Sequence, residues 1–114
     1  MLSYNQYFNQ NADNLKKLSE SLISYISPDE LIILEGNANY TTYPNTNFML
    51  QEKNELEQLS RQRAEIVKCA LVFYGIPAEQ ILIKANGGDN YIVEPNDEDN
   101  WKNRRVEIFI EKVE

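Results

Sequence analysis

The stretch "ELEQLSRQRAEIVKCALVFYGIP", residues 55–77, decides the fold. Its apolar residues recur three and four positions apart, which is typical of one face of an amphipathic helix. These residues are Leu56, Leu59, Ile66, Val67, Ala70, Leu71 and Tyr74. Gly75 suits the left-handed turn that ends a helix, and Pro77 prevents the helix from continuing. The sequence therefore predicts a long helix with one buried face.

A second helix is predicted nearer the N-terminus. "DNLKKLSESLISYI", residues 13–26, places leucines on one helical face, with Asp13 as N-cap and Ser-Pro at 27–28 as the stop. Before it, residues 2–8, "LSYNQYF", are compatible with a first edge strand or with the remnant of one.

Three further strands are expected. Residues 30–36, "ELIILEG", form a continuous apolar run typical of a strand covered on both faces. Residues 80–85, "QILIKA", read as another short strand, and a last one spans roughly residues 104–112, where apolar residues alternate with glutamates. Between them, residues 37–54 are rich in Asn and Thr and are predicted to be a long functional loop.

Because helices and strands alternate, the expected fold is α+β: a single two-layer sandwich domain over residues 1–114, with a mixed sheet and both helices on one face. The expected order is (β)αβαββ, with a right-handed first crossover. The first strand is short or truncated in this reading.

Composition excludes several classes of function. The net charge of −7 argues against nucleic-acid binding and against adsorption to an anionic membrane. No apolar run is long enough to span a membrane, so no membrane insertion by this domain is expected. "MLSYNQYFNQ" does not resemble a signal peptide, which leaves two alternatives: a cytosolic protein, or a domain cut from a longer exported chain.

The residues that usually carry catalysis or metal binding are scarce. The chain has no His, and Cys69 is its one cysteine, so no enzymatic activity and no cofactor are expected. The acidic residues of "EPNDEDN", 94–100, lack the glycine of a calcium loop. A solvated acidic loop is favoured there over a metal site.

Arg63 does not fit its helix. It lies four residues after Leu59 and four before Val67, on the apolar face, where a guanidinium is costly unless it is paired. The spacing leaves two interpretations. The side chain reaches past the core edge or makes an internal ion pair, or it binds an acidic ligand.

Three fragments carry a family resemblance. "LSRQRAEIV" at 59–67, "GI" at 75–76 and "NRRVEI" at 103–108 follow, in order, the pattern L-S-x-x-R-A-x-x-V, G-I, N-R-R-V-E-I. Over roughly residues 13–112 the chain thus resembles the C-terminal domain of the OmpA/MotB/Pal family. The resemblance implies a periplasmic βαβαββ domain that belongs to an outer-membrane protein, a lipoprotein or an inner-membrane-anchored protein.

The resemblance also implies a ligand. Such domains bind the peptide stem of peptidoglycan non-covalently, at diaminopimelate, and by analogy Arg63 grips a carboxylate of that residue. An arginine suits this role because its planar fork binds a carboxylate through two parallel hydrogen bonds. The implied binding set is Arg63, Asn37, Ala38, Asn39, Leu59, Arg104 and Arg105, without a metal.

The chain departs from the family at one important position. Where the family carries G-H-T-D, this chain has "GNAN", residues 36–39, so that Asn39 replaces an Asp that faces the ligand's ammonium group. A neutral amide binds an ammonium group more weakly than a carboxylate does. Two functions therefore stay open: anchoring an envelope assembly to peptidoglycan, or an OmpA-like fold that has lost this ligand and binds envelope protein partners.

The two arginines of the last fragment are expected to differ. Strand alternation puts Arg104 on the side of Val106 and Ile108, and Arg105 on the side of Glu107. One arginine of the pair is expected to be structural, and the alternation favours Arg104, on the core side, for a buried ion pair.

Overall fold

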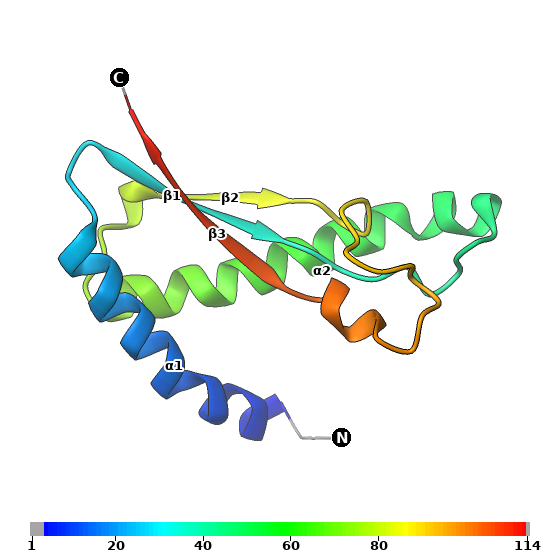
Figure 1. Cartoon of the computed structure of the whole chain (residues 1–114), viewed down its shortest axis with the longest axis horizontal. Coiled ribbons are helices and arrows are strands. Elements are labelled where there is room, and N and C mark those ends of the chain that lie inside the picture. Colours follow the sequence, from blue (N-terminus) through cyan, green and yellow to red (C-terminus); the bar gives the residue numbers. More distant parts are fainter. Residues whose placement is uncertain (1–3, 114) are drawn as a thin grey trace.

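Within residues 4–113 the protein forms a three-stranded mixed sheet with two α-helices (Figure 1). The computed structural model describes residues 4–113, with side chains from Asn14 onward. Its elements are α1 (Tyr4–Tyr25), β1 (Glu30–Gly36), α2 (Thr46–Phe73), β2 (Ile81–Ala85) and β3 (Val106–Lys112), with short 3-10 helices at Ala78–Gln80 and Asn100–Asn103. The strand order is β2-β1-β3, with β1 parallel to β2 and antiparallel to β3. The predicted α+β class is confirmed.

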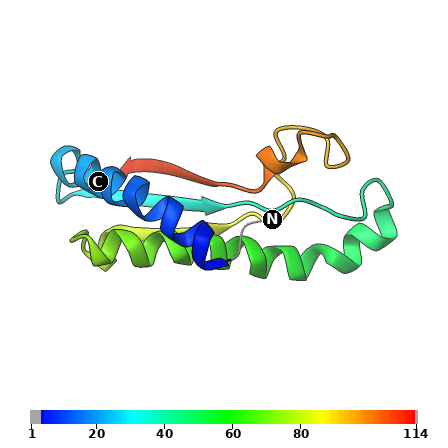
Figure 2. The ribbon, with the colours of Figure 1, turned by 90° about the horizontal axis from the view of Figure 1, so that it is seen from below.

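Both helices cover the same face of the sheet. Ile32 and Leu34 of β1 are fully buried, and they join one apolar cluster with residues of α1 (Leu18, Leu22, Ile26) and of α2 (Ala64, Val67, Leu71). Figure 2 looks at this face, with α1 crossing in front of the strands. Burial of this apolar surface is the main force that holds the layers together.

Gly36 lets α2 approach the end of β1. A Cβ atom built on Gly36 would lie 1.8 Å from the carbonyl oxygen of Ser60 in α2, a distance that no side chain tolerates. Gly36 thereby fixes how deeply the helix sits over the sheet at the end where the long loops begin.

The N-terminal prediction was wrong. Residues 4–8, expected as part of an edge strand, are helical, while residues 2–3 lie outside the described part of the chain. The described part of α1 already includes Tyr4, so Asp13 lies inside the helix and is not its N-cap. The observed order over the described residues is therefore αβαββ.

The second helix also begins earlier than predicted. α2 starts at Thr46, so residues 46–54 are helical and the loop after β1 is shorter than expected. Asn45 is the N-cap, and its side chain accepts a hydrogen bond from the backbone N–H of Phe48. An N-cap amide of this kind stabilises the first turn of a helix. The polar composition of residues 46–54 led us to predict a loop there instead of this first part of α2.

Candidate functional site

The candidate site lies where β1 ends, between the loop of residues 37–45 and the loop of residues 86–105. The four residues that follow β1, from Asn37 to Tyr40, are all buried. The N–H of Asn37 donates to Arg105 O at 2.8 Å, and the N–H of Ala38 donates to Gly87 O at 2.7 Å. These bonds join both ends of the loop of residues 86–105 to the segment after β1 and give the end of the sheet a defined backbone.

Arg63 lies at this segment. Its side chain extends from α2 and is partly buried. Its Nη1 atom donates a hydrogen bond to the carbonyl oxygen of Asn37 at 2.9 Å. The structure thus places two predicted site residues, Arg63 and Asn37, in direct contact. The guanidinium is held at the start of the loop and at the edge of the core, where a charge-assisted hydrogen bond offsets part of its desolvation.

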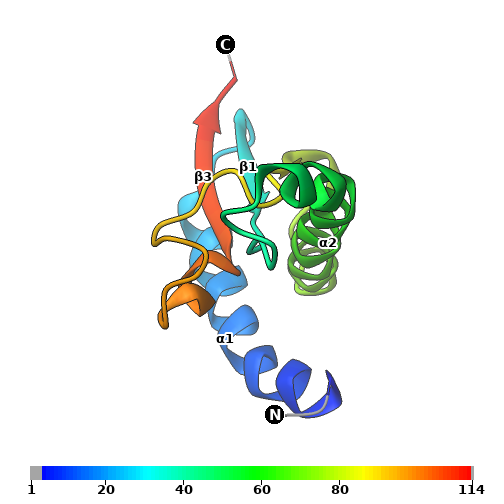
Figure 3. The ribbon, with the colours of Figure 1, turned by 90° about the vertical axis from the view of Figure 1, so that its right-hand side faces the viewer.

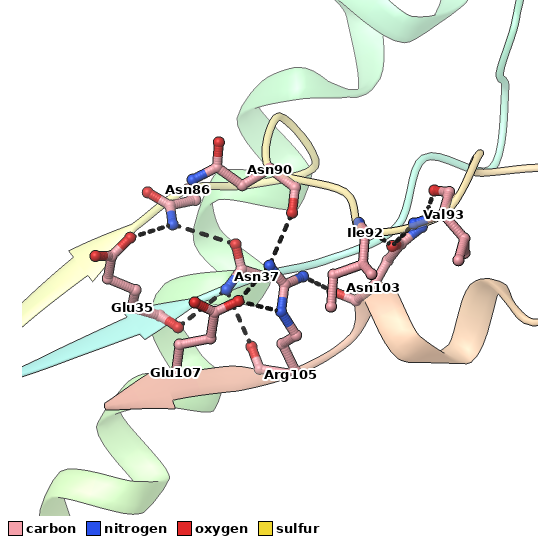
Figure 4. Close-up of polar contacts among 9 residues, drawn as sticks. All are labelled: Glu35, Asn37, Asn86, Asn90, Ile92, Val93, Asn103, Arg105 and Glu107. Atoms are coloured by element: carbon pink, nitrogen blue, oxygen red, sulfur yellow. Dashed lines mark hydrogen bonds and ion pairs between the residues drawn. The ribbon is translucent and has the colours of Figure 1, made fainter. Parts of the chain in front are cut away.

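The side chain of Asn37 connects the two loops (Figure 4). Its Nδ2 donates to Glu35 O at 3.1 Å, and its Oδ1 accepts from Asn86 Nδ2 at 3.1 Å. Asn86 Nδ2 also donates to the carboxylate of Glu35 at 2.8 Å. Asn37 is only 1% exposed, so its amide positions the backbone that Arg63 contacts.

Asn39 is bonded within the protein. Its Nδ2 donates to Tyr40 O at 3.1 Å and to Pro95 O at 3.2 Å, and its Oδ1 accepts from Asn103 Nδ2 at 2.9 Å. Both amide hydrogens are therefore used in holding the loop of residues 86–105 against the segment after β1. A carboxylate has no hydrogens to donate and would not make the two donated bonds.

Asn103 is a residue of the site whose anchoring role sequence reasoning missed. It is fully buried, and its Nδ2 donates to Asn39 Oδ1. Figure 4 shows its other contacts: Nδ2 donates to Val93 O, and Oδ1 accepts from the N–H groups of Ile92 and Val93. The signal was present, because Asn103 opens the N-R-R fragment. It was read only as part of the resemblance and not as a loop anchor.

The assignment of the two arginines was wrong. Arg104 is exposed, so it forms no buried ion pair, and both arginines precede β3 and are not part of it. Arg105 is the structural one: its side chain is 20% exposed, Nη2 lies 2.5 Å from Glu107 Oε1, and Nη2 donates to Asn90 O at 3.0 Å. The alternation rightly put Arg105 beside Glu107, but the ion pair lies on that side and not on the core side.

The remaining two predicted site residues differ in burial. Ala38 is 1% exposed and contributes its backbone to the loop contact with Gly87. Leu59, on α2, is 37% exposed. Ala38 is therefore a structural neighbour of the Arg63 contact, whereas Leu59 presents an apolar side chain at the surface of the helix.

Glu52 fixes the loop after β1. Its carboxylate accepts from the N–H and hydroxyl groups of both Thr41 and Thr42, with Thr42 Oγ1 at 2.8 Å. Desolvation raises the pKa of Glu52, but the hydrogen bonds from Thr41 and Thr42 together outweigh it, so the pKa is lowered from 4.5. The ionised carboxylate is therefore the form that holds the loop.

Tyr40 ties the same loop to Asp89. Its hydroxyl donates to Asp89 Oδ1 at 2.9 Å. Burial, and then the hydrogen bond and charge of Asp89, raise the pKa of Tyr40 to about 12. Because the folded-state pKa lies above the ordinary value, this group contributes stability below pH 10 that is lost as the pH rises through about 12.

Two further properties bear on function. Within the described residues, no group of three or more His, Cys, Asp or Glu side chains is arranged to hold a metal ion. None of the helices in residues 4–113 is long and apolar enough to cross a membrane.

Comparison with solved structures establishes the fold family. The C-terminal domain of Helicobacter pylori MotB superposes with a TM-score of 0.72 at 24% identity, over 90% of this chain and 74% of that one. The OmpA-like domain of FopA1 from Francisella tularensis gives 0.69 at 19% identity, over 90% and 62%. This chain has an OmpA-like fold. The resemblance inferred from the three sequence fragments is confirmed.

Another solved structure with this OmpA-like fold is the peptidoglycan-associated lipoprotein from Burkholderia pseudomallei. It superposes with a TM-score of 0.65 at 22% identity, over 91% of this chain and 76% of that one. A longer periplasmic fragment of MotB is covered over 53% of its length. No model of a known protein family matches the chain, and no curated protein matches it in sequence.

Proposed function

We propose that this OmpA-like domain binds peptidoglycan non-covalently in the periplasm and anchors an envelope protein to the cell wall. The ligand is the stem peptide, and Arg63 binds a carboxylate of its diaminopimelate residue. The domain acts as a binding module and not as an enzyme.

The position of Arg63 carries the proposal. Arg63 extends from α2 to the segment after β1, where its Nη1 donates a hydrogen bond to Asn37 O. Its side chain is partly buried. Arginine at a rigid, partly desolvated position is the side chain best suited to carboxylate recognition. The fold is shared with a peptidoglycan-associated lipoprotein and with periplasmic domains of MotB, which supports the same ligand and compartment.

The remaining residues of the set take supporting roles in this proposal. Asn37 and Ala38 offer backbone groups, and the Oδ1 atom of Asn39 meets the ligand's ammonium group beside its bond to Asn103. Leu59, on α2, offers an apolar side chain that the ligand contacts. Arg104 and Arg105 border the site from the other loop, with Arg105 fixed by Glu107.

A sedimentation assay with purified cell-wall sacculi tests the role of Arg63. We expect wild-type protein to co-sediment and Arg63→Ala to lose at least about nine-tenths of the bound fraction, since loss of a charged hydrogen bond costs about 1.5–3 kcal/mol. The matched control is Arg61→Ala, an exposed arginine on the same helix, which should bind like wild type.

Two outcomes would contradict the proposal. Equal retention of Arg63→Ala and wild type would remove Arg63 from the site. Absence of wild-type binding at low salt would exclude the cell wall as ligand. Circular dichroism must show that Arg63→Ala stays folded, because its contact with Asn37 O is also lost.

One observation favours a second function, an interaction module for envelope protein partners. Both amide hydrogens of Asn39 are bonded to Tyr40 O and Pro95 O, so this position serves the loop. We expect Asn39→Asp to lower the free energy of unfolding by about 2 kcal/mol, since two donors are lost. Under the first function Asn39→Asp tightens binding to a diaminopimelate stem peptide; isothermal titration that shows no gain favours the second function.

A further inference from the structure

Tyr91 is an aromatic residue at the surface of the loop of residues 86–105. It is 43% exposed, and its ring meets that of Tyr43 edge to face, with 6.2 Å between the ring centroids and 65° between the ring planes. Figure 3 looks toward the two loops, where the loop of residues 37–45 (cyan to green) lies beside the loop of residues 86–105 (yellow to orange). Tyr43 and Tyr91 thus form an aromatic pair that joins the two loops. Exposed aromatic side chains on loops above a rigid scaffold are typical of binding surfaces.

The Tyr43–Tyr91 pair is held in place by its neighbours. Tyr43 packs against a small buried cluster that contains Tyr40 and Leu56. Its hydroxyl donates a hydrogen bond to the carboxylate of Glu94, and its ring contacts the exposed ring of Tyr91. Because these contacts already order both side chains, a ligand that packs on them loses little conformational entropy on binding.

The apolar and polar groups of this surface match those of a sugar. A pyranose has C–H groups that pack on the electron-rich face of an aromatic ring, and hydroxyl groups that need acceptors. The exposed ring of Tyr91 offers such a face. Oε2 of Glu94 accepts from Tyr43, whereas Oε1 accepts no hydrogen bond from the residues that the structure describes and can accept one from a sugar hydroxyl. Asp97 and Glu98, further along the same loop, are exposed and repel anions, which favours a neutral sugar.

The pair also lies at a suitable distance from Arg63. Arg63 bonds to Asn37 O, and two residues further along Asn39 donates to Pro95 O. Pro95 directly follows the glutamate that accepts from the hydroxyl of Tyr43. An extended residue spans about 3.5 Å, so this series of contacts covers on the order of 20 Å. In peptidoglycan, two amino acids and the side chain of diaminopimelate separate the sugar from the carboxylate assigned to Arg63, which is a span of the same order.

We propose that the Tyr43–Tyr91 pair is a sugar subsite beside the stem-peptide site. The ring of Tyr91 packs against the C–H face of the N-acetylated muramic acid that carries the stem peptide, and Glu94 Oε1 accepts a hydrogen bond from one of its hydroxyl groups. That sugar is neutral in peptidoglycan, because its lactyl carboxyl group is joined to the peptide as an amide. The subsite rests on the proposed function and extends the ligand from the stem peptide to the glycan strand.

Two ligands separate the sugar from the peptide: the tripeptide acetyl-L-Ala-γ-D-Glu-diaminopimelate, and the same tripeptide carried by N-acetylmuramic acid. By isothermal titration we expect the wild type to bind the muramyl tripeptide at least about fivefold more tightly. Tyr91→Ala should abolish this preference and bind the acetyl tripeptide like wild type, whereas Tyr91→Phe should keep the preference because it retains the ring. The matched control is Phe73→Ala: this aromatic residue is 81% exposed and ends α2, on the opposite side of the molecule from the loops (Figure 1). It should bind both ligands like wild type.

NMR gives a second readout. The C–H protons of the bound sugar should shift upfield with wild type and not with Tyr91→Ala, because protons above an aromatic face experience its ring current. Equal affinity of the wild type for the two ligands would overturn the sugar subsite, leave the stem-peptide proposal standing and favour a protein partner for the pair. A Tyr91→Ala variant that keeps the preference, or that loses affinity equally for both ligands, would also overturn the subsite. Binding of neither ligand by the wild type would overturn both proposals.

Discussion

The helix-covered part of the molecule and its loop end are stabilised by different interactions. The helix-covered part, made of the three strands and two helices, is held by apolar packing around residues such as Leu34 and Leu71. The loop end, residues 37–45 and 86–105, is held by buried amides, above all Asn37, Asn39 and Asn103. The difference teaches that the fold and the candidate site depend on separate sets of residues, which single substitutions can tell apart.

The largest effect is expected where the two parts meet, at Gly36→Ala. The new Cβ would lie 1.8 Å from Ser60 O, a backbone atom that moves only if α2 shifts as a whole. We expect a loss of about 4 kcal/mol in the free energy of unfolding, or failure to fold, as measured by chemical denaturation. Gly75→Ala is the comparison for backbone strain without a clash: its φ of 111° disfavours Ala, but its nearest neighbour, Ile23 Cδ1, lies 3.6 Å away, so we expect a smaller loss of about 1 kcal/mol. Equal losses would show that close packing of α2 on β1 is not the cause.

Asn103→Ala should break the loop end and leave the helix-covered part folded. It removes the partner of Asn39 Oδ1 and leaves the N–H groups of Ile92 and Val93 without their acceptor. Of these groups only Asn39 Oδ1 belongs to a buried residue, whereas Ile92 is exposed and its N–H can bond to water. A buried polar group without its partner costs roughly 1–3 kcal/mol, so we expect a loss of about 2 kcal/mol. Exchange of the Ile92 and Val93 amides should accelerate more than exchange in β1. The exposed Asn96→Ala is the control, and uniform acceleration throughout the molecule would argue against two separable parts.

The same division explains what the sequence could predict. The helix-covered part was predictable because apolar residues at helical and strand spacing leave a periodic signal, as in residues 55–77 and 30–36. The resemblance added the fold family, which the solved structures confirm. The N-terminal strand was mispredicted because residues 4–8 are too few to show a helical period by themselves.

The loop end was predictable only in part. Arg63 was identified because a charge on an apolar helical face breaks the period, and its contact with Asn37 shows why it is tolerated. The anchoring role of Asn103 and the bond of Arg105 to Asn90 O depend on which backbone groups fold back across the loop. Such pairings join residues distant in sequence, and no local spacing encodes them.

The smallest effect, and the one that tests the loop end alone, is expected for Glu52→Gln. The folded-state pKa of Glu52 is lowered from 4.5, so its carboxylate contributes stability above pH 4.5 that is lost as the pH falls through the folded-state value. Thr41 and Thr42 each donate two hydrogen bonds to this group, and an amide accepts through only one of its two heavy atoms. We expect Glu52→Gln to be less stable than wild type by about 1 kcal/mol at neutral pH, and this difference should shrink as the pH falls below 4.5, in urea unfolding at a series of pH values. The control is Glu55→Gln, an exposed glutamate on the same helix, which should match wild type throughout. A stability difference for Glu52→Gln that stays constant with pH would show that shape, and not the charge of the carboxylate, holds the loop.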